Sequence, residues 1–245
     1  MTVLSVASAV SAFVGADIPQ RVFGSADRHS VEMQHLTNEA ARDIADRRDW
    51  QRLARRMVLT GDGARIAFDL PADFGRFRLN AHFLSTDTGW RIPRLDGPEA
   101  AIAFDYGTTA VGSSWRLEAG QIVIFPSLGV GATVETPYQS KHIVITQDGA
   151  QAEFDADDQA FALDERLLKL AMIWMWKANK GLPYGQDFDN FETALNRAIA
   201  QDGPRSAISL ARSEYFRDDP AAFPRTVGPG GGTGTDYVSI YEANK

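Results

Sequence analysis

The spacing of the hydrophobic residues changes twice along the chain, from a helical period to a strand period and back. In residues 1–58 and 160–203, apolar side chains recur three and four positions apart, as they do in amphipathic helices. Residues 60–160 instead contain at least six short runs rich in β-branched and aromatic residues, such as QIVIFP and KHIVIT, separated by Gly- and Asp-containing turns. Short strands with no helical period among them favour an antiparallel sheet.

This pattern predicts an α+β fold with an inserted domain. We expect a helical domain built from both chain ends, residues 1–58 and 160–218, and an antiparallel β-sandwich or open-barrel domain at residues 59–159. Residues 219–245 include the run PRTVGPGGGTGT, whose composition is typical of a flexible linker. They are therefore expected to form a flexible C-terminal tail.

Composition excludes several kinds of function. The 245 residues include no cysteine, so thiol catalysis, cysteine-based metal sites and disulfides are excluded. The formal net charge is -7, whereas a dedicated nucleic-acid binder is more often basic. The apolar N-terminus lacks the basic residues of a signal peptide, and its valines recur at helical spacing, which predicts an amphipathic first helix.

The segment LLKLAMIWMWKANKGLPY, residues 167–184, is too short in its apolar part to cross a membrane. Its uninterrupted apolar run, residues 170–176, has seven residues, against about 20 needed to span a bilayer. Gly181 followed by Pro183 predicts the end of a helix.

This helix is apolar on two faces, which a helix at the surface of a monomer does not need. We expect one face to enter the core of the subunit and the other to meet a neighbouring copy or the first helix. The predicted subunit-contact residues are Trp174, Met175 and Trp176. A helix wholly buried within its own domain is the alternative.

A basic cluster follows the second helical pattern. Arg48, Arg52 and Arg55 form a possible channel or interface face that could contact phosphates. Because Asp46 and Asp49 lie among them, a solvated charged face is the alternative.

Motifs for catalysis are missing. None of the four histidines has the spacing of a zinc helix, and no Gly-x-Ser-x-Gly elbow is present. The Gly-rich run from Gly228 lacks the lysine and the following helix of a phosphate-binding loop. We therefore expect no enzymatic activity and no catalytic, cofactor-binding or metal-binding residue, which favours a binding or structural protein.

Three segments carry a resemblance to a known family. LTNEAARDIADRRDWQRL (36–53), IVIFPSLGVGATVETPYQSKHIV (122–144) and LLKLAMIWMWKANKGLPYGQDFDNFETAL (167–195) resemble, in order and spacing, the head-to-tail adaptor proteins of tailed bacteriophages. These proteins include the connectors of the tail-tubular and head-completion type. The resemblance covers most of residues 1–203.

The resemblance implies a structural virion protein without catalysis or cofactor. Such adaptors form a ring, usually of twelve copies, that binds the portal protein on one side and a tail or nozzle protein on the other. DNA passes through the lumen without sequence-specific binding, and no membrane is involved. The implied location is the head–tail interface of the virion, after assembly in the host cytoplasm.

The last residues alternate like a strand without a partner, and adaptors of this kind often extend a terminus into the portal. The predicted portal-docking residues are Tyr237, Val238, Ile240 and Tyr241. A disordered terminus is the alternative.

Two other functions stay open at this point. A tail-associated carbohydrate- or receptor-binding β module would expose a cluster of aromatic residues such as Trp90, Tyr106 and Trp115. An unrecognised hydrolase would need carboxylates that converge in space.

Overall fold

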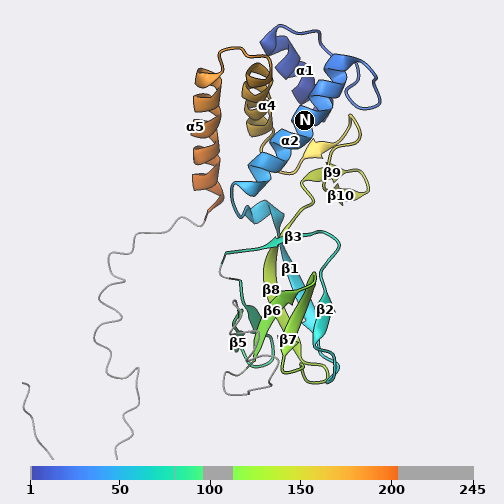
Figure 1. Cartoon of the computed structure of the whole chain (residues 1–245), viewed down its shortest axis with the longest axis vertical. Helices are drawn as coiled ribbons and strands as arrows, with labels where there is room; N and C mark the ends of the chain where they lie inside the picture. Colours follow the sequence, from blue (N-terminus) through green and yellow to red (C-terminus); the bar gives the residue numbers. More distant parts are fainter. Residues whose placement is uncertain (1, 80, 96–112, 204–245) are drawn as a thin grey trace, which may run out of the picture. The chain divides into compact units, whose positions relative to one another are not determined.

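The structure, a computed structural model, describes residues 2–79, 81–95 and 113–203 (Figure 1). All of these residues belong to one unit, Met1–Arg205. The two ends of this unit supply its α-helices, and the residues between them supply antiparallel sheets. The predicted α+β class is therefore confirmed at the level of helices and antiparallel sheets.

The described residues form four α-helices, namely α1 (Val3–Val14), α2 (Arg28–Asp46), α4 (Glu165–Asn179) and α5 (Gly185–Asp202). Two helices begin at an aspartate that accepts a hydrogen bond from the first turn: Asp27 from the Ser30 backbone at 3.2 Å and Asp164 from the Arg166 backbone at 2.8 Å. Gly181 follows α4 with a φ of 66°, a conformation that glycine adopts without strain. The predicted helix end at this glycine is confirmed.

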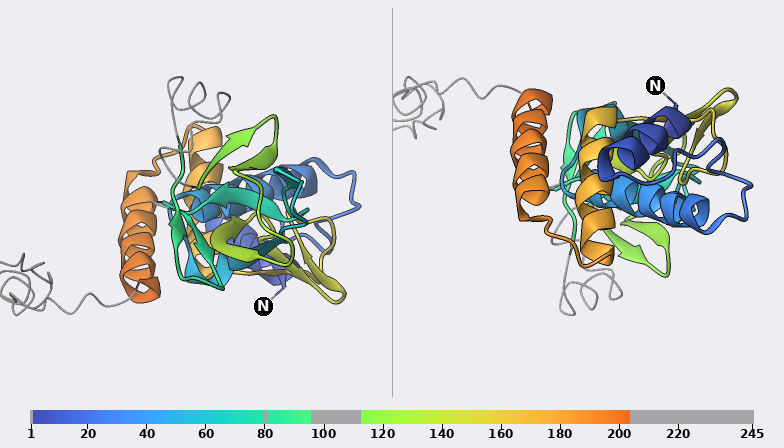
Figure 2. Two further views of the ribbon diagram at one scale, coloured as in Figure 1. Left: turned by 90° about the horizontal axis from the view of Figure 1, so that it is seen from below. Right: turned by 90° about the horizontal axis from the view of Figure 1, so that it is seen from above.

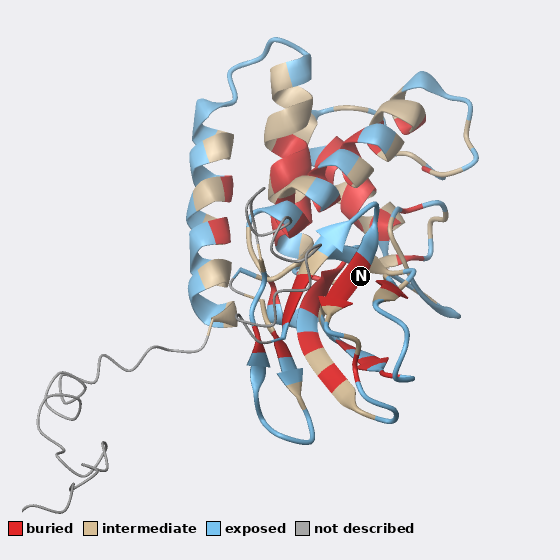
Figure 3. Ribbon diagram, turned by 60° about the horizontal axis from the view of Figure 1, so that its bottom comes forward, coloured by how far each residue is buried: buried red, intermediate tan, exposed pale blue. Residues whose placement is uncertain are grey.

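Helix α4 lies between α5 on one side and α1 and α2 on the other (Figure 2). It buries Leu167, Leu168, Ala171, Met172 and Ile173, which join the hydrophobic cluster of the helices. Helix α5 buries only Phe191 and Leu195, and the side facing away from α4 is exposed (Figure 3). Of these two helices, α4 has the more apolar sequence and buries more of its residues than α5.

The strands of the described residues form three sheets, with orders β1-β8-β4-β5 (β3 also pairs with β8), β2-β7-β6 and β10-β9-β11. All named pairs are antiparallel, and a single isolated bridge, Arg94 to Trp115, is parallel. The bounds are β1 (Ala54–Thr60), β2 (Ala67–Asp69), β3 (Phe74–Phe77), β4 (Phe83–Ser85), β5 (Arg91–Ile92), β6 (Ser114–Glu118), β7 (Gln121–Phe125), β8 (Thr133–Ser140), β9 (Val144–Thr146), β10 (Gly149–Gln151) and β11 (Ala160–Phe161).

A second hydrophobic cluster fills the first two sheets. Trp115 is fully buried in it, with Phe83 edge-on at 5.1 Å between ring centroids and Phe77 at 4.7 Å. The third sheet packs against the helices instead. Val144 of β9 and the preceding Ile143 both belong to the hydrophobic cluster of the helices. The hydrophobic cluster of the helices thus includes residues from the range 59–159 that was predicted for the β domain. The predicted domain boundaries stay a prediction.

The expectation of helix through residue 58 is wrong. Helix α2 ends at Asp46, a 3₁₀ turn covers Gln51–Leu53, and β1 already begins at Ala54. Residues 54–60 pair with β8 along their whole length, and Met57 and Leu59 alternate into the β cluster. Tertiary pairing therefore decides the conformation here, since Arg55 and Arg56 suit a helix equally well.

Candidate functional site

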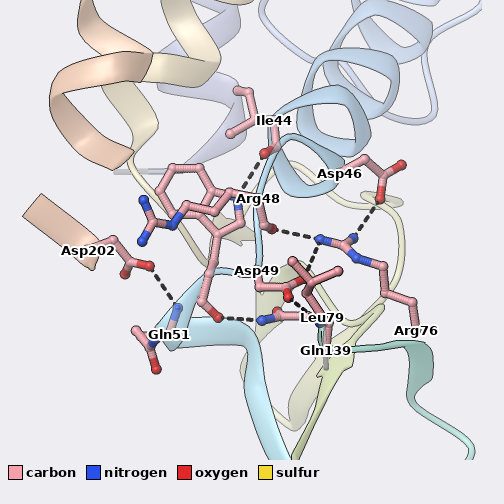
Figure 4. Close-up of polar contacts among 10 residues, drawn as sticks. Ile44, Asp46, Arg48, Asp49, Gln51, Arg76, Leu79, Gln139 and Asp202 are labelled. Carbon is pink, nitrogen blue, oxygen red and sulfur yellow. Dashed lines mark hydrogen bonds and ion pairs between the residues drawn. The ribbon is translucent and has the colours of Figure 1, made fainter. Parts of the chain in front are cut away.

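The junction segment, Arg47 to Gln51, connects α2 to the strands and is tied to several other elements (Figure 4). Trp50 is buried in it. Its indole Nε1 donates to the Ile44 carbonyl at 2.8 Å, and its own carbonyl accepts from Gln139 Nε2 at 2.9 Å. The end of α2 is therefore connected to β8 through one residue, Trp50.

Asp49 holds the chain that follows β3. Its carboxylate accepts from Arg76 Nη2 and from the Leu79 backbone, both at 3.0 Å. Arg76 also donates to the Arg48 carbonyl at 2.8 Å and pairs with Asp46 at 3.3 Å (Figure 4). The backbone of Leu79 is thereby fixed, although its side chain is 87% exposed.

The three arginines predicted as a basic face occupy different environments. Arg48 is half-buried, and its Nη1 donates to the Ile199 carbonyl in the last turn of α5 at 2.7 Å. The same turn is held by Asp202, whose carboxylate accepts from the Gln51 backbone at 2.8 Å. Arg52 and Arg55 are exposed. Arg48 thus has a packing role, and a channel or interface role of the three stays a prediction.

Helices α2 and α4 border a groove of about 690 Å³, called here the α2–α4 groove. Lys180 of α4 pairs with Glu32 of α2 at 2.7 Å. The hydrogen bond and the charge of Lys180 hold the pKa of Glu32 below its ordinary value, so this carboxylate stays ionised. The groove therefore combines an ion pair with the apolar side chains of α4.

Trp174, Met175 and Trp176 are half-buried, and all three line this groove. The indole of Trp174 also meets α5, edge-on to Phe188 at 5.2 Å between ring centroids. Lys180 Nζ lies 5.6 Å from the ring centre of Trp176. Large apolar surface is therefore partly accessible at the position expected for a subunit contact, while that contact itself stays a prediction.

The predicted portal-docking residues Tyr237, Val238, Ile240 and Tyr241, and the Gly-rich run before them, lie outside the described residues.

Two aspartates, Asp157 and Asp187, have packing roles. Asp157 accepts from the backbones of Val22 and Phe23 at 3.0 and 2.9 Å, and Asp187 pairs with Lys177 at 2.6 Å. Within the described ranges, no group of three or more His, Asp or Glu side chains is placed to hold a metal ion. None of the helices in the described part has the length and apolar character needed to cross a bilayer.

A further surface was not predicted from the sequence. Two adjoining hollows of about 590 and 580 Å³ share Asp49, Arg78 and Leu79 and form what we call the arginine hollow. Its arginines are Arg56, Arg76, Arg78 and Arg94. Three separate segments supply them, with Arg76 and Arg78 at the end of β3, so no local pattern of charge could have brought all four together.

Comparison with known proteins identifies the family of the chain. A search of the curated proteins finds no match to the chain. The family model of the SU10 adaptor protein matches residues 1–215, and the resemblance to phage head-to-tail adaptors is thereby confirmed. Adaptors of this kind are structural components of the phage virion and not a known class of enzymes. Since the match covers far more than half of the 245 residues, the chain belongs to the SU10 adaptor protein family.

Proposed function

We propose that the chain is the subunit of a closed ring that joins the portal of the phage head to the tail and surrounds the passing DNA. The resemblance implies twelve copies. The ring presents one face to the portal protein and the other to a tail or nozzle protein.

The observation that carries this proposal is the double apolar character of α4. One part of the helix, which includes Leu168 and Met172, is fully buried and packs in the core of the subunit. Trp174, Met175 and Trp176 remain half-buried along the α2–α4 groove. Partly accessible tryptophans of this kind are typical of contact surfaces between proteins. A neighbouring copy that covers the groove would remove them from water.

The charge of the chain fits a channel through which DNA moves. A formal net charge of -7 gives an acidic ring, which makes few strong contacts to phosphates. DNA can then pass without being held at any sequence. The exposed residues Arg52 and Arg55 are too few to change this balance.

The C-terminal residues supply the contact with the portal in this proposal. Tyr237, Val238, Ile240 and Tyr241 would add a strand to a sheet edge of the portal protein. A chain that ends at Gly228 should still fold and should bind the portal weakly. Undiminished portal binding by the shortened chain would rule out this part of the proposal.

Native mass spectrometry and negative-stain imaging, with and without the portal protein of the same phage, test the ring. We expect a closed ring close to twelve copies, either alone or assembled on the portal. A chain that stays monomeric in both preparations, or that is missing from the head–tail interface of purified particles, contradicts the proposed function.

No observation favours the receptor-binding alternative. Trp115, one of the aromatic residues expected at its surface, is fully buried in the β cluster. Trp90 is 76% exposed, and Tyr106 lies outside the described residues. The predicted cluster of exposed aromatics is therefore not formed by Trp90 and Trp115.

A further inference from the structure

The arginine hollow carries an excess of positive charge in an acidic chain. Among the described residues, four arginines line it, against two carboxylates, Asp49 and Glu135. Both carboxylates are already paired, Asp49 with Arg76 at 3.0 Å and Glu135 with Arg56 at 3.0 Å. Arg78 makes only a 3.5 Å contact with the Gln51 side-chain oxygen among the described residues. The hollow is therefore suited to a partner that brings further carboxylates.

Apolar side chains stand exposed among these arginines. Leu79 is 87% exposed and Leu84 is 43% exposed, and both line the hollow. Asp49 fixes the backbone of Leu79, so the outward position of this leucine is held by a specific hydrogen bond at 3.0 Å. An apolar centre with charged residues around it is the usual composition of a protein–protein contact.

A surface of the opposite charge lies on the third sheet and the loop that follows it. Between Lys141 and Arg166 the chain contains no lysine or arginine. We call residues 145–158 the acidic lobe, and its exposed carboxylates include Asp148, Asp155 and Asp158. Hydrogen bonds from Gln151 and Gln159 lower the pKa of Asp155, which keeps the lobe negative.

The third sheet also exposes an apolar residue beside these carboxylates. Ile145 of β9 is 44% exposed, and its neighbours across the sheet are Ala150 and Ala160. Small residues on both sides leave the isoleucine accessible from outside. The lobe and the hollow therefore have matching compositions, each with an apolar centre and each with charges of the opposite sign.

The two surfaces lie on opposite sides of the unit. In Figure 1 the segment from β3 to β4 runs down the left side, whereas β9 and β10 lie on the right, and both views of Figure 2 show the same separation. Two different and complementary surfaces on opposite sides of one chain are what a head-to-tail ring requires.

Within the proposed ring, and resting on that proposal, we propose that the acidic lobe of one copy docks into the arginine hollow of the next. Leu79 and Leu84 of the next copy then cover Ile145 of the first. Arg78 and Arg94 lie opposite Asp148 and Asp158. The contact repeats around the ring, so each copy uses both of its surfaces.

DNA is a poorer occupant of the hollow than a second copy. Phosphates would meet the carboxylates of Asp49 and Glu135, and a DNA backbone offers nothing apolar to Leu79. A second copy offers both Ile145 and the carboxylates around it. Retention of a short DNA duplex by the hollow, lost in Arg78→Glu, would therefore contradict the inference.

A pair of cysteines tests the contact directly, because the chain has none of its own. A full-length Leu79→Cys/Ile145→Cys variant places one cysteine on each of the two surfaces, and a disulfide joins them only where Cα atoms come within about 7 Å. Under mild oxidation we expect a ladder of covalent oligomers on non-reducing gels. Each single-cysteine variant should give dimers at most.

The outcome separates this inference from the proposed function. The oxidation is carried out on the ring, assembled alone or on the portal protein and confirmed by native mass spectrometry. An intact ring without a covalent ladder overturns the inference and leaves the ring itself in place. Failure of the unmodified chain to assemble in either preparation overturns both.

Charge reversal provides a second measurement. Arg78→Glu, or Asp148→Lys with Asp158→Lys, should weaken assembly on the order of tenfold or more, because like charges then face each other. All three substitutions in one chain should restore part of the lost assembly, since position 78 again faces charges of the opposite sign. Arg197→Glu and Asp189→Lys, at exposed positions of α5, serve as matched controls. Weakening without rescue in the combined variant contradicts the pairing.

Discussion

The side-chain amide of Asn38 pairs with the backbone of Phe154 in both directions. Asn38 Nδ2 donates to the Phe154 carbonyl at 3.1 Å, and the Phe154 N–H donates to Asn38 Oδ1 at 2.7 Å. The bond joins α2 to the loop before β11, across 116 positions of the sequence. Asn38 stands in the Asn-Glu-Ala part of the segment that resembles phage adaptors, and its role there is to hold the fold together.

Asn38→Asp should destabilise the fold. The substitution removes the donor and places a charged oxygen beside the Phe154 carbonyl, so a part-buried acceptor is left unsatisfied. We expect a loss of about 1–3 kcal/mol in the free energy of unfolding, measured with chemical denaturant. Glu39→Gln is the matched control because Glu39 is exposed on the same helix. Equal stability of the two variants would contradict this role.

Arg48→Ala should loosen the last turn of α5. Two hydrogen bonds attach this turn to the junction segment. Arg48 Nη1 donates to a carbonyl of the turn, and the Asp202 carboxylate accepts from the junction backbone. Without the guanidinium we expect faster amide hydrogen exchange at residues 199–203, at a cost of about 1 kcal/mol in the free energy of unfolding. Arg52→Ala, at an exposed position, should leave both quantities unchanged. Unchanged exchange in Arg48→Ala would show that Asp202 alone holds the turn.

The ends of α4 can be predicted from the sequence because their signals are local. The aspartate at the start of α4 and the glycine after its end each act on backbone groups within a few residues. The period of apolar residues likewise matches the buried side of α5, where Phe191 and Leu195 lie four positions apart. Such features need no knowledge of the rest of the fold.

Strand boundaries and polar contacts were poorly predicted because they depend on partners far along the chain. FRLNAHFL has the composition of a single strand, but β3 ends at Phe77 and β4 begins at Phe83, with Leu79 held between them by Asp49. The arginine hollow combines Arg56, Arg78 and Arg94 from three separate segments. No periodicity within a segment reports a contact of this kind.

Trp176→Glu distinguishes a contact between copies from burial within one copy. Trp176 is half-buried in the α2–α4 groove, whereas Met172, one turn before it, is fully buried. If the groove meets a neighbouring copy, the glutamate should reduce the oligomer mass and leave the circular dichroism spectrum of the chain unchanged. Met172→Glu should instead prevent folding, because it buries an unpaired charge. Unfolding in both variants would refute the contact.

Tyr138 should make the fold sensitive to alkaline pH. Burial, together with the hydrogen bond from its hydroxyl to Asp73 at 2.7 Å, raises the pKa of Tyr138 to about 12 from its ordinary 10.0. Since the folded state holds this proton more tightly than the unfolded state, the contribution is fully present below pH 10.0 and is lost as the pH rises towards about 12. Denaturant unfolding of the unmodified chain should give a lower free energy of unfolding above this pH window than below it. Tyr138→Phe should be less stable at neutral pH by about 1 kcal/mol, and its further loss across the window should be smaller. An equal alkaline loss in both chains would mean that other groups cause it.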